Sequence, residues 1–156
     1  MHKKIKRPIY FFIIDILISI DNSSRYFKKI KKPWDLVKNS LVCDAIIRNL
    51  EIIGEAMNHV LRDEKLQSLI KPDWRDIVDF RNIAIHEYFG INYEEVFDIV
   101  ETEIPKLESE IFDLIKSLKD DRELLFSIEC VCEELLSKSK NQNLLYINKI
   151  KKILIL

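Results

Sequence analysis

The chain is patterned by apolar residues that recur every three or four positions, the spacing of helices with one buried face. The first such stripe consists of Ile9, Phe12, Ile13, Ile16 and Ile20. Pro8 suits the first turn of a helix because the proline nitrogen needs no hydrogen-bond partner there. Pro33 then interrupts the pattern. We therefore predict a first helix from about Pro8 to Lys31.

A second, longer stripe predicts a helix from about Asp35 to Arg62. Its members are Val42, Ile46, Leu50, Ile53, Met57 and Val60. Gly54 lies inside this helix, where glycine costs about 1 kcal/mol relative to alanine. Either another helix approaches closely at this position, or the glycine is a tolerated weakness. A connector over residues 63–72 follows, with room for a short helical turn.

Two further helices complete the regular pattern. Asp73 is a plausible N-cap for a third helix that ends near Tyr88, before Gly90. Asn92 and Glu95 resemble a capping box at the start of a fourth helix. Its apolar stripe is Val96, Phe97, Val100, Ile104, Leu107, Ile111, Leu114 and Leu118. Pro105 falls within that stripe and should bend the helix.

Four helices of this kind close into an antiparallel bundle, which we assign to residues 1–120. Residues 121–156 form a C-terminal extension of a different character. Its first part, Arg122 to Leu136, predicts a fifth helix, and a polar break follows over residues 137–143. Residues 144–156 alternate apolar pairs with lysines, a pattern too short to separate strand from helix.

Composition supports a single all-α domain. The 156 residues are 47% apolar and 33% charged, with only two glycines and four prolines. Sheets and long loops need more turn residues than this. The formal net charge is −1, so no global positive field attracts nucleic acid. Positive charge is local instead, in lysine-rich runs over residues 3–7, 28–32 and 149–152, whereas residues 94–123 are acidic.

Cysteine usage and the N-terminal segment indicate a cytoplasmic protein. Cys43, Cys130 and Cys132 form no disulfide or zinc pattern, and we interpret them as reduced packing residues. The apolar run over residues 9–20 follows basic residues, as in a signal peptide. Asp15 interrupts it, however, and the run is too short to cross a bilayer. We predict no membrane association.

The segment over residues 81–88, Arg-Asn-Ile-Ala-Ile-His-Glu-Tyr, gathers the most chemistry in the shortest stretch. On a helix, Asn82 and His86 share a face, and Arg81 and Tyr88 nearly do. A permanent cation, an imidazole and a phenol together suit a phosphate or a nucleotide. The structural alternatives are a capping histidine, an arginine paired with Asp76 or Asp79, an asparagine bonded to a neighbouring helix, and a packing tyrosine.

These residues resemble the Arg-x4-His-x-Tyr signature of the HepT toxins, which belong to the HEPN group of small helical ribonucleases. Three more stretches match in order: residues 44–56 (Asp-Ala-Ile-Ile-Arg-Asn-Leu-Glu-Ile-Ile-Gly-Glu-Ala), residues 74–77 (Trp-Arg-Asp-Ile) and residues 88–92 (Tyr-Phe-Gly-Ile-Asn). The resemblance covers roughly residues 8–118, and we recognise no counterpart for the region after residue 120.

The resemblance implies an endoribonuclease that needs no metal or cofactor, with Arg81 and His86 catalytic and Asn82 supporting them. Arg81 would hold the phosphate while His86 moves protons. One histidine cannot easily be base and acid at once, and HEPN ribonucleases form the active groove at a homodimer interface. Glu51 and Glu55 could bind a divalent ion, but ion pairs with Arg48 or Arg81 are the stronger expectation.

The resemblance also implies regulation at Tyr88. In HepT systems the antitoxin MntA, a minimal nucleotidyltransferase, transfers AMP to the tyrosine of this signature. We therefore expect the toxin of a type VII toxin–antitoxin system, with RNA as substrate and an MntA-like antitoxin as partner. The alternative is a non-catalytic HEPN module that helps a nucleotidyltransferase hold its substrate, although such a module would not need the Arg81–His86 pair.

Overall fold

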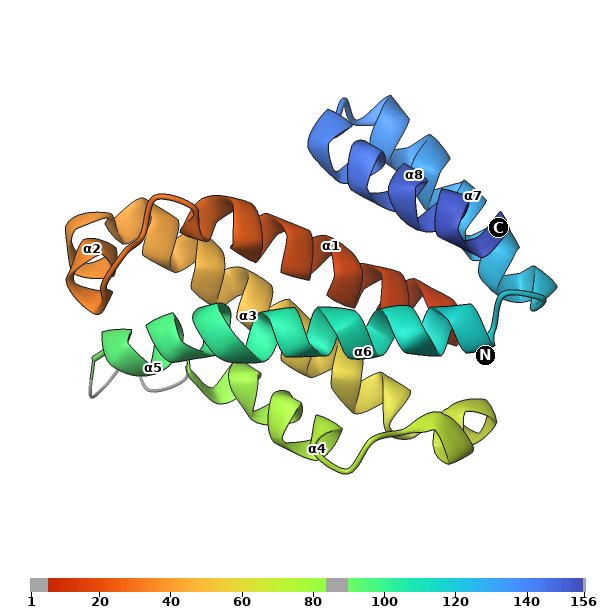
Figure 1. The fold of residues 1–156 in the computed structure, drawn as a ribbon, viewed down its shortest axis with the longest axis horizontal. Helices are drawn as coiled ribbons and strands as arrows, with labels where there is room; N and C mark the ends of the chain where they lie inside the picture. The colour runs from red at the N-terminus through yellow and green to blue at the C-terminus, as the bar shows by residue number, and fades with distance from the viewer. Residues whose placement is uncertain (1–5, 84–89, 156) are drawn as a thin grey trace, which may run out of the picture.

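Long antiparallel helices form the body of the structure, a computed structural model that describes residues 6–83 and 90–155 (Figure 1). Helix α1 (Ile9–Phe27) packs against α3 (Ser40–Val60) and α6 (Ile104–Ser117), which both run opposite to it. The described residues contain no strand, so the predicted all-α bundle is confirmed. Within the same residues, no helix combines the length and apolarity that a bilayer crossing requires.

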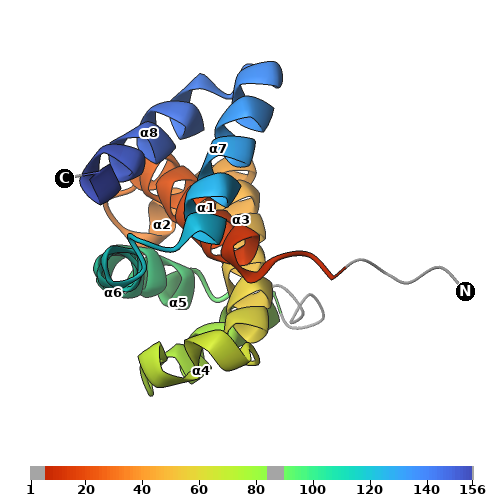
Figure 2. The same ribbon diagram turned by 90° about the vertical axis from the view of Figure 1, so that its right-hand side faces the viewer.

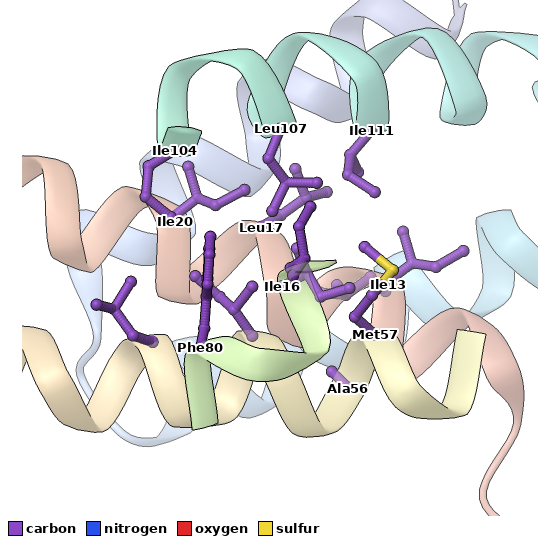
Figure 3. Close-up of a cluster of buried hydrophobic side chains, with 14 of the residues drawn as sticks. Ile13, Ile16, Leu17, Ile20, Ala56, Met57, Phe80, Ile104, Leu107 and Ile111 are labelled. Carbon is purple, nitrogen blue, oxygen red and sulfur yellow. The ribbon is translucent and has the colours of Figure 1, made fainter. Parts of the chain in front are cut away.

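The core of the bundle is built from the predicted stripes. Side chains of α1, α3 and α6 meet one another and Phe80 in a continuous apolar cluster (Figure 3). The residues with no exposed side chain include Ile13, Ile16, Ile20, Ile46, Leu50, Ile53, Met57, Val60, Ile104 and Ile111. Burial of each such side chain contributes about 1.5–3 kcal/mol. Hydrophobic burial therefore fixes which face of each helix points inward.

The predicted second helix is two helices. Helix α2 (Pro33–Lys38) ends at Asn39, whose φ of −122° and ψ of 68° are not helical, and α3 begins at Ser40. The Asn39 side-chain amide donates to the backbone oxygen of Asp35 at 3.0 Å. Asparagine competes in this way for backbone hydrogen bonds, which explains the break. The single helix predicted from Asp35 to Arg62 is wrong at this point.

The predicted third helix also differs from a regular α-helix. Residues Glu64–Leu69 form the short turn η1, then α4 (Trp74–Ile77) passes into a 3₁₀-helix, η2 (Val78–Ile83). Asp73 occupies the N-cap of α4 but makes no capping hydrogen bond, because its carboxylate accepts from the Lys106 ammonium at 2.7 Å. The predicted end of this helix near Tyr88 lies outside the described residues.

The fourth predicted helix is continuous but contains a wider turn. Helix α5 (Tyr93–Asp98) leads into the π-helix η4 (Ile99–Glu103) and then into α6. One half of the predicted capping box is confirmed: the Asn92 side chain accepts a hydrogen bond from the Glu95 backbone N–H at 3.1 Å. Pro105 is the second residue of α6, one residue after the end of the π turn. Proline has no N–H to donate to the preceding turn, and its ring crowds a carbonyl group of that turn. The π turn accommodates both effects at the place where we predicted a bend.

The C-terminal extension is a helical hairpin of α7 (Arg122–Ser137) and α8 (Asn141–Ile155), which settles the undecided last segment as a helix. Figure 2 shows the hairpin on the opposite side of α1 from α4. It is joined to the bundle by polar contacts as well as by apolar ones. The Tyr10 hydroxyl donates to Asp121, the N-cap of α7, and this bond lowers the pKa of Asp121. The boundary that we placed at residue 120 stays a prediction.

Candidate functional site

Arg81 is positioned by a close approach between η2 and α3. A Cβ atom added to Gly54 would lie 2.8 Å from the backbone nitrogen of Arg81 and 2.9 Å from the carbonyl oxygen of Val78. Both contacts are too short for any residue larger than glycine, and both involve backbone atoms. The predicted approach of another helix at Gly54 is therefore confirmed, and the element that approaches is the one that carries Arg81.

The side chain of Arg81 is held from α3 as well. Its guanidinium donates to the carboxylate of Glu55 at 3.3 Å, and the same carboxylate lies 3.6 Å from the His59 imidazole. His59 in turn stacks on the ring of Phe12, with ring centroids 4.1 Å apart. The alternative in which Arg81 pairs with Asp76 or Asp79 is wrong, whereas the expected ion pair with Glu51 or Glu55 is present, and Glu55 on α3 is the partner.

Asn82 bonds within its own helix. Its side-chain amide donates to the Asp79 carboxylate at 3.1 Å. This spacing follows from the 3₁₀ geometry, in which residues three apart lie on the same face. The alternative of a buried bond to a neighbouring helix is therefore wrong. His86 and Tyr88 lie outside the described residues, so the shared face predicted for Asn82 and His86 stays a prediction.

A groove of about 550 Å³ opens beside Arg81, between α1, α3 and η2. Three arginines line it, and each is paired with a carboxylate. Arg7 pairs with Asp15, a hydrogen bond that raises the pKa of Arg7, and Arg48 donates to Glu51 at 3.0 Å. Guanidinium groups facing a groove are the side chains best suited to hold phosphates in two parallel hydrogen bonds. A phosphate that enters must exchange with these carboxylates.

Sequence reasoning missed part of this groove. Arg48 was expected as an ion-pair partner only, and Arg7 as one member of a basic run. The Arg48–Glu51 spacing of three residues on one helix was the available signal for the former. For Arg7 no local signal exists, because its place depends on how α1 crosses α3.

The other side of η2 faces a groove of opposite charge. It has a volume of about 810 Å³ and an apolar floor that includes Ile77, Phe80 and Leu107. Its acidic lining residues are Asp73, Asp76, Asp79, Glu94, Glu95, Asp98, Glu103 and Glu110, against one cation, Lys106. Such a rim repels phosphates. η2 therefore separates a groove that suits a polyanion from one that does not.

The remaining candidate groups take structural roles. Glu51 and Glu55, considered as metal ligands, each pair with an arginine, and the described residues contain no cluster of three or more potential ligands. All three cysteines are free thiols. Burial raises the pKa of the Cys43 thiol to about 11, so Cys43 is a packing residue rather than a nucleophile.

Comparisons with known proteins identify the family of the chain. The sequence model of the family described as ribonuclease HepT-like matches residues 16–114, which include the second half of α1, all of α3, and Arg81. A "putative RNase" of Methanocaldococcus jannaschii is 37% identical over 108 residues, which cover 68% of this chain and 95% of that protein. A "probable ribonuclease HepT" of Thermococcus cleftensis is 38% identical over 72 residues, covering 46% of this chain and 64% of that protein.

A third relative extends into the hairpin. A "gamma-glutamylcyclotransferase and putative RNase" of M. jannaschii is 28% identical over 151 residues, or 96% of this chain and 65% of that protein. A match of that length extends past residue 120, into the region for which we recognised no counterpart. No solved structure gives a significant match to the chain. The match of the family model over residues 16–114 and the 37% identity to the M. jannaschii protein show that the chain belongs to the ribonuclease HepT-like family.

Proposed function

We propose that the protein is the toxin of a type VII toxin–antitoxin system, an endoribonuclease that works without a metal ion. One observation carries the proposal: Arg81, at the head of the signature, is held by backbone contact with Gly54 at the rim of an arginine-lined groove. Membership of a ribonuclease family supplies the reaction class.

Cleavage of RNA through its own 2′-hydroxyl needs a base, an acid and a group that stabilises charge on phosphorus. Arg81 takes the last role. Its guanidinium exchanges Glu55 for a non-bridging phosphate oxygen and opposes the charge that develops there. His86, five residues on, takes the proton-transfer role because an imidazole titrates near neutral pH. The acidic groove on the far side of η2 favours entry of RNA from the Arg48 side.

The purified protein should cleave mixed cellular RNA in buffer that contains excess EDTA. Arg81 and His86 supply both the charge and the proton transfer, so chelation should leave the rate within about twofold. Products are followed by gel electrophoresis, with and without added Mg²⁺. Cleavage that vanished in EDTA would contradict the metal-independent mechanism. Absence of cleavage under all conditions, together with tight binding to a nucleotidyltransferase, would favour the non-catalytic module instead.

We further propose a homodimer in which each subunit contributes to a shared groove, since two proton-transfer groups are needed. Inactive Arg81→Ala subunits mixed with inactive His86→Ala subunits should then regain part of the parent activity. Random exchange forms mixed dimers as about half of the total, and each brings one Arg81 and one His86 to the shared groove, a combination that neither inactive homodimer contains. Sedimentation velocity measures the assembly. A stable monomer at the assay concentration would exclude the shared site.

Tyr88 is proposed as the acceptor of AMP from the cognate MntA-like antitoxin. The phosphodiester would place a negative charge two residues from His86, where it competes with RNA for Arg81. Tyr88→Phe keeps the ring but loses the acceptor, so it should cleave RNA and resist silencing. Intact mass after incubation with the antitoxin and ATP reports the adduct. An equal adduct on the Phe variant would place the modification elsewhere.

A further inference from the structure

The two tryptophans of the chain have opposite environments. Trp74 is 1% exposed, and its indole N–H donates to the Glu110 carboxylate at 2.7 Å. Trp34, in the first turn of α2, is 57% exposed. Val37, three residues along the same helix and so on the same face, is 36% exposed, and Leu41, the second residue of α3, is 84% exposed. An indole left in water beside other exposed apolar groups marks a binding surface more often than a packing defect.

Lysines surround this indole. Lys28, Lys29, Lys31, Lys32 and Lys38 are all exposed. The only acid over residues 28–38 is Asp35, so five lysines and one aspartate give this stretch a formal charge of +4. Asp35 is already engaged, because its carboxylate accepts from the backbone N–H groups of Lys31 and Lys32. Among the described residues, no carboxylate lies within ion-pair distance of any of these five ammonium groups.

The groove beside Arg81 lacks such uncommitted charge. Arg7, Arg48 and Arg81 each hold a carboxylate there, and the whole chain has a formal charge of −1. Affinity for a polyanion depends on how many of its charges the protein neutralises. A ribonuclease of this composition therefore needs a second, cationic surface to retain its substrate.

We propose that residues 28–38, here called the α2 surface, bind single-stranded RNA: the lysines contact phosphates and Trp34 stacks on a base. Both parts of this recognition are ordinary for single strands, because stacking tolerates any base and lysines follow the backbone. The inference rests on the proposed function, since it supplies a binding site for that reaction's substrate. The site is separate from the Arg81 groove and takes no part in the chemistry.

RNA fits this surface better than the two other occupants that apolar patches attract. A second copy of the chain bound about a twofold axis would bring the α2 surface against itself and oppose like charges. A membrane would be met by only a few apolar side chains on a helix of six residues, less than an interfacial helix normally inserts. A nucleic acid strand satisfies the lysines and the indole together.

The geometry predicts how long the RNA must be. Helix α3 connects the α2 surface to the groove, and the 14 steps from Ser40 to Gly54 correspond to about 21 Å along its axis. About six stacked nucleotides span that distance at roughly 3.4 Å each. RNAs longer than this reach both sites at once, so Trp34 should strengthen their binding. A dinucleotide is too short to reach both sites, and Trp34 should not strengthen its binding.

The test measures binding of fluorescein-labelled oligouridylates of 4 and 16 nucleotides to protein carrying Arg81→Ala, which prevents turnover. Trp34→Ala should weaken binding of the 16-mer about tenfold. The double change Lys31→Ala and Lys32→Ala should also weaken it and should flatten the salt dependence. Phe126→Ala, which removes an equally exposed aromatic ring (64%) on α7, is the matched control. The 16-mer should also quench Trp34 fluorescence while buried Trp74 stays silent, and Trp34→Phe should remove that signal.

Each outcome of the binding test either supports or overturns the proposal. Unchanged binding by Trp34→Ala, or an equal loss with Phe126→Ala, would overturn the proposal while leaving RNA cleavage by the parent protein as a separate question. Binding that depends on Trp34 in a protein that never cleaves RNA would support the α2 surface and reject the proposed ribonuclease. Trp34-dependent binding to vesicles of anionic lipid, with no binding to the 16-mer, would overturn the proposal in favour of a membrane surface.

Discussion

Replacing Arg81 with alanine is expected to lower the rate of RNA cleavage by about two to four orders of magnitude, which is the range for loss of a general acid–base residue. Replacing His86 with alanine should lower the rate by a similar factor. The Arg81 guanidinium is partly exposed at the groove, and its main side-chain contact is the ion pair with Glu55. An exposed pair of this kind contributes little to folding. The variant should therefore keep its melting temperature within a few degrees while it loses activity. Single-turnover cleavage of a labelled RNA measures the effect.

Two companion variants separate charge from position. Arg75→Ala removes an equally positive and exposed side chain from α4, outside the groove, and should cleave within about twofold of the parent. Arg81→Lys retains the charge but cannot form two parallel hydrogen bonds, so most of the loss should persist. If Arg81→Ala cleaved as fast as Arg75→Ala, the assignment of Arg81 would be wrong.

The second large effect is expected at Gly54. Gly54→Ala raises helix propensity by about 1 kcal/mol, yet its methyl group would meet two backbone atoms of η2 at 2.8 and 2.9 Å. Backbone cannot yield as a flexible side chain does, and overpacking of this kind costs about 1–3 kcal/mol. The two effects together give an expected net loss of up to about 2 kcal/mol in the free energy of unfolding. Displacement of Arg81 by about 1 Å should lower cleavage roughly 100-fold.

Controls distinguish displacement from simple instability. Ile111→Val costs about 1 kcal/mol in a buried position on α6, and it should leave cleavage by the folded protein nearly unchanged. Gly90 offers a different comparison, since its φ of 83° is left-handed but, within the described ranges and apart from its chain neighbours, no atom lies within 4 Å of an added Cβ. Gly90→Asn should therefore be tolerated, whereas Gly54→Asn should not. If Gly54→Ala cleaved RNA as fast as the parent, the position of η2 would not control the cleavage rate.

The sequence predicts the helices well wherever burial alone decides their structure. The stripe through Ile46, Leu50 and Ile53 is fully buried, as its spacing indicates. Prediction fails where one polar group redirects the backbone. Asn39 divides the predicted second helix because its side-chain amide bonds to the backbone oxygen of Asp35. The spacing of apolar residues carries no information about such a bond. The 3₁₀ geometry of η2 was missed for a related reason, since apolar residues spaced three and four apart fit both helix types.

The candidate site was predicted in part. Gly54 gave a clear signal, because glycine within a strong helix needs a reason and the approach of η2 supplies one. The pairing of Arg81 with Glu55 was anticipated only as one of several options, since residues 26 apart in sequence meet through the packing of two helices. Arg7 was anticipated only as a member of a basic run and not as part of this groove. His86 and Tyr88 rest on the family signature and on the experiments above.

The π turn over Ile99–Glu103 has a consequence for comparing this chain with its relatives. It holds one residue more than an α-helical turn, and each residue rotates a helix by about 100°. Where a relative carries an unbroken α-helix, the one-residue gap therefore belongs within residues 99–103. A gap placed instead in the preceding loop would shift residues 90–98 by one position against their true equivalents. Any comparison of aligned positions between relatives, for the residues that follow the signature, therefore depends on placing this gap correctly.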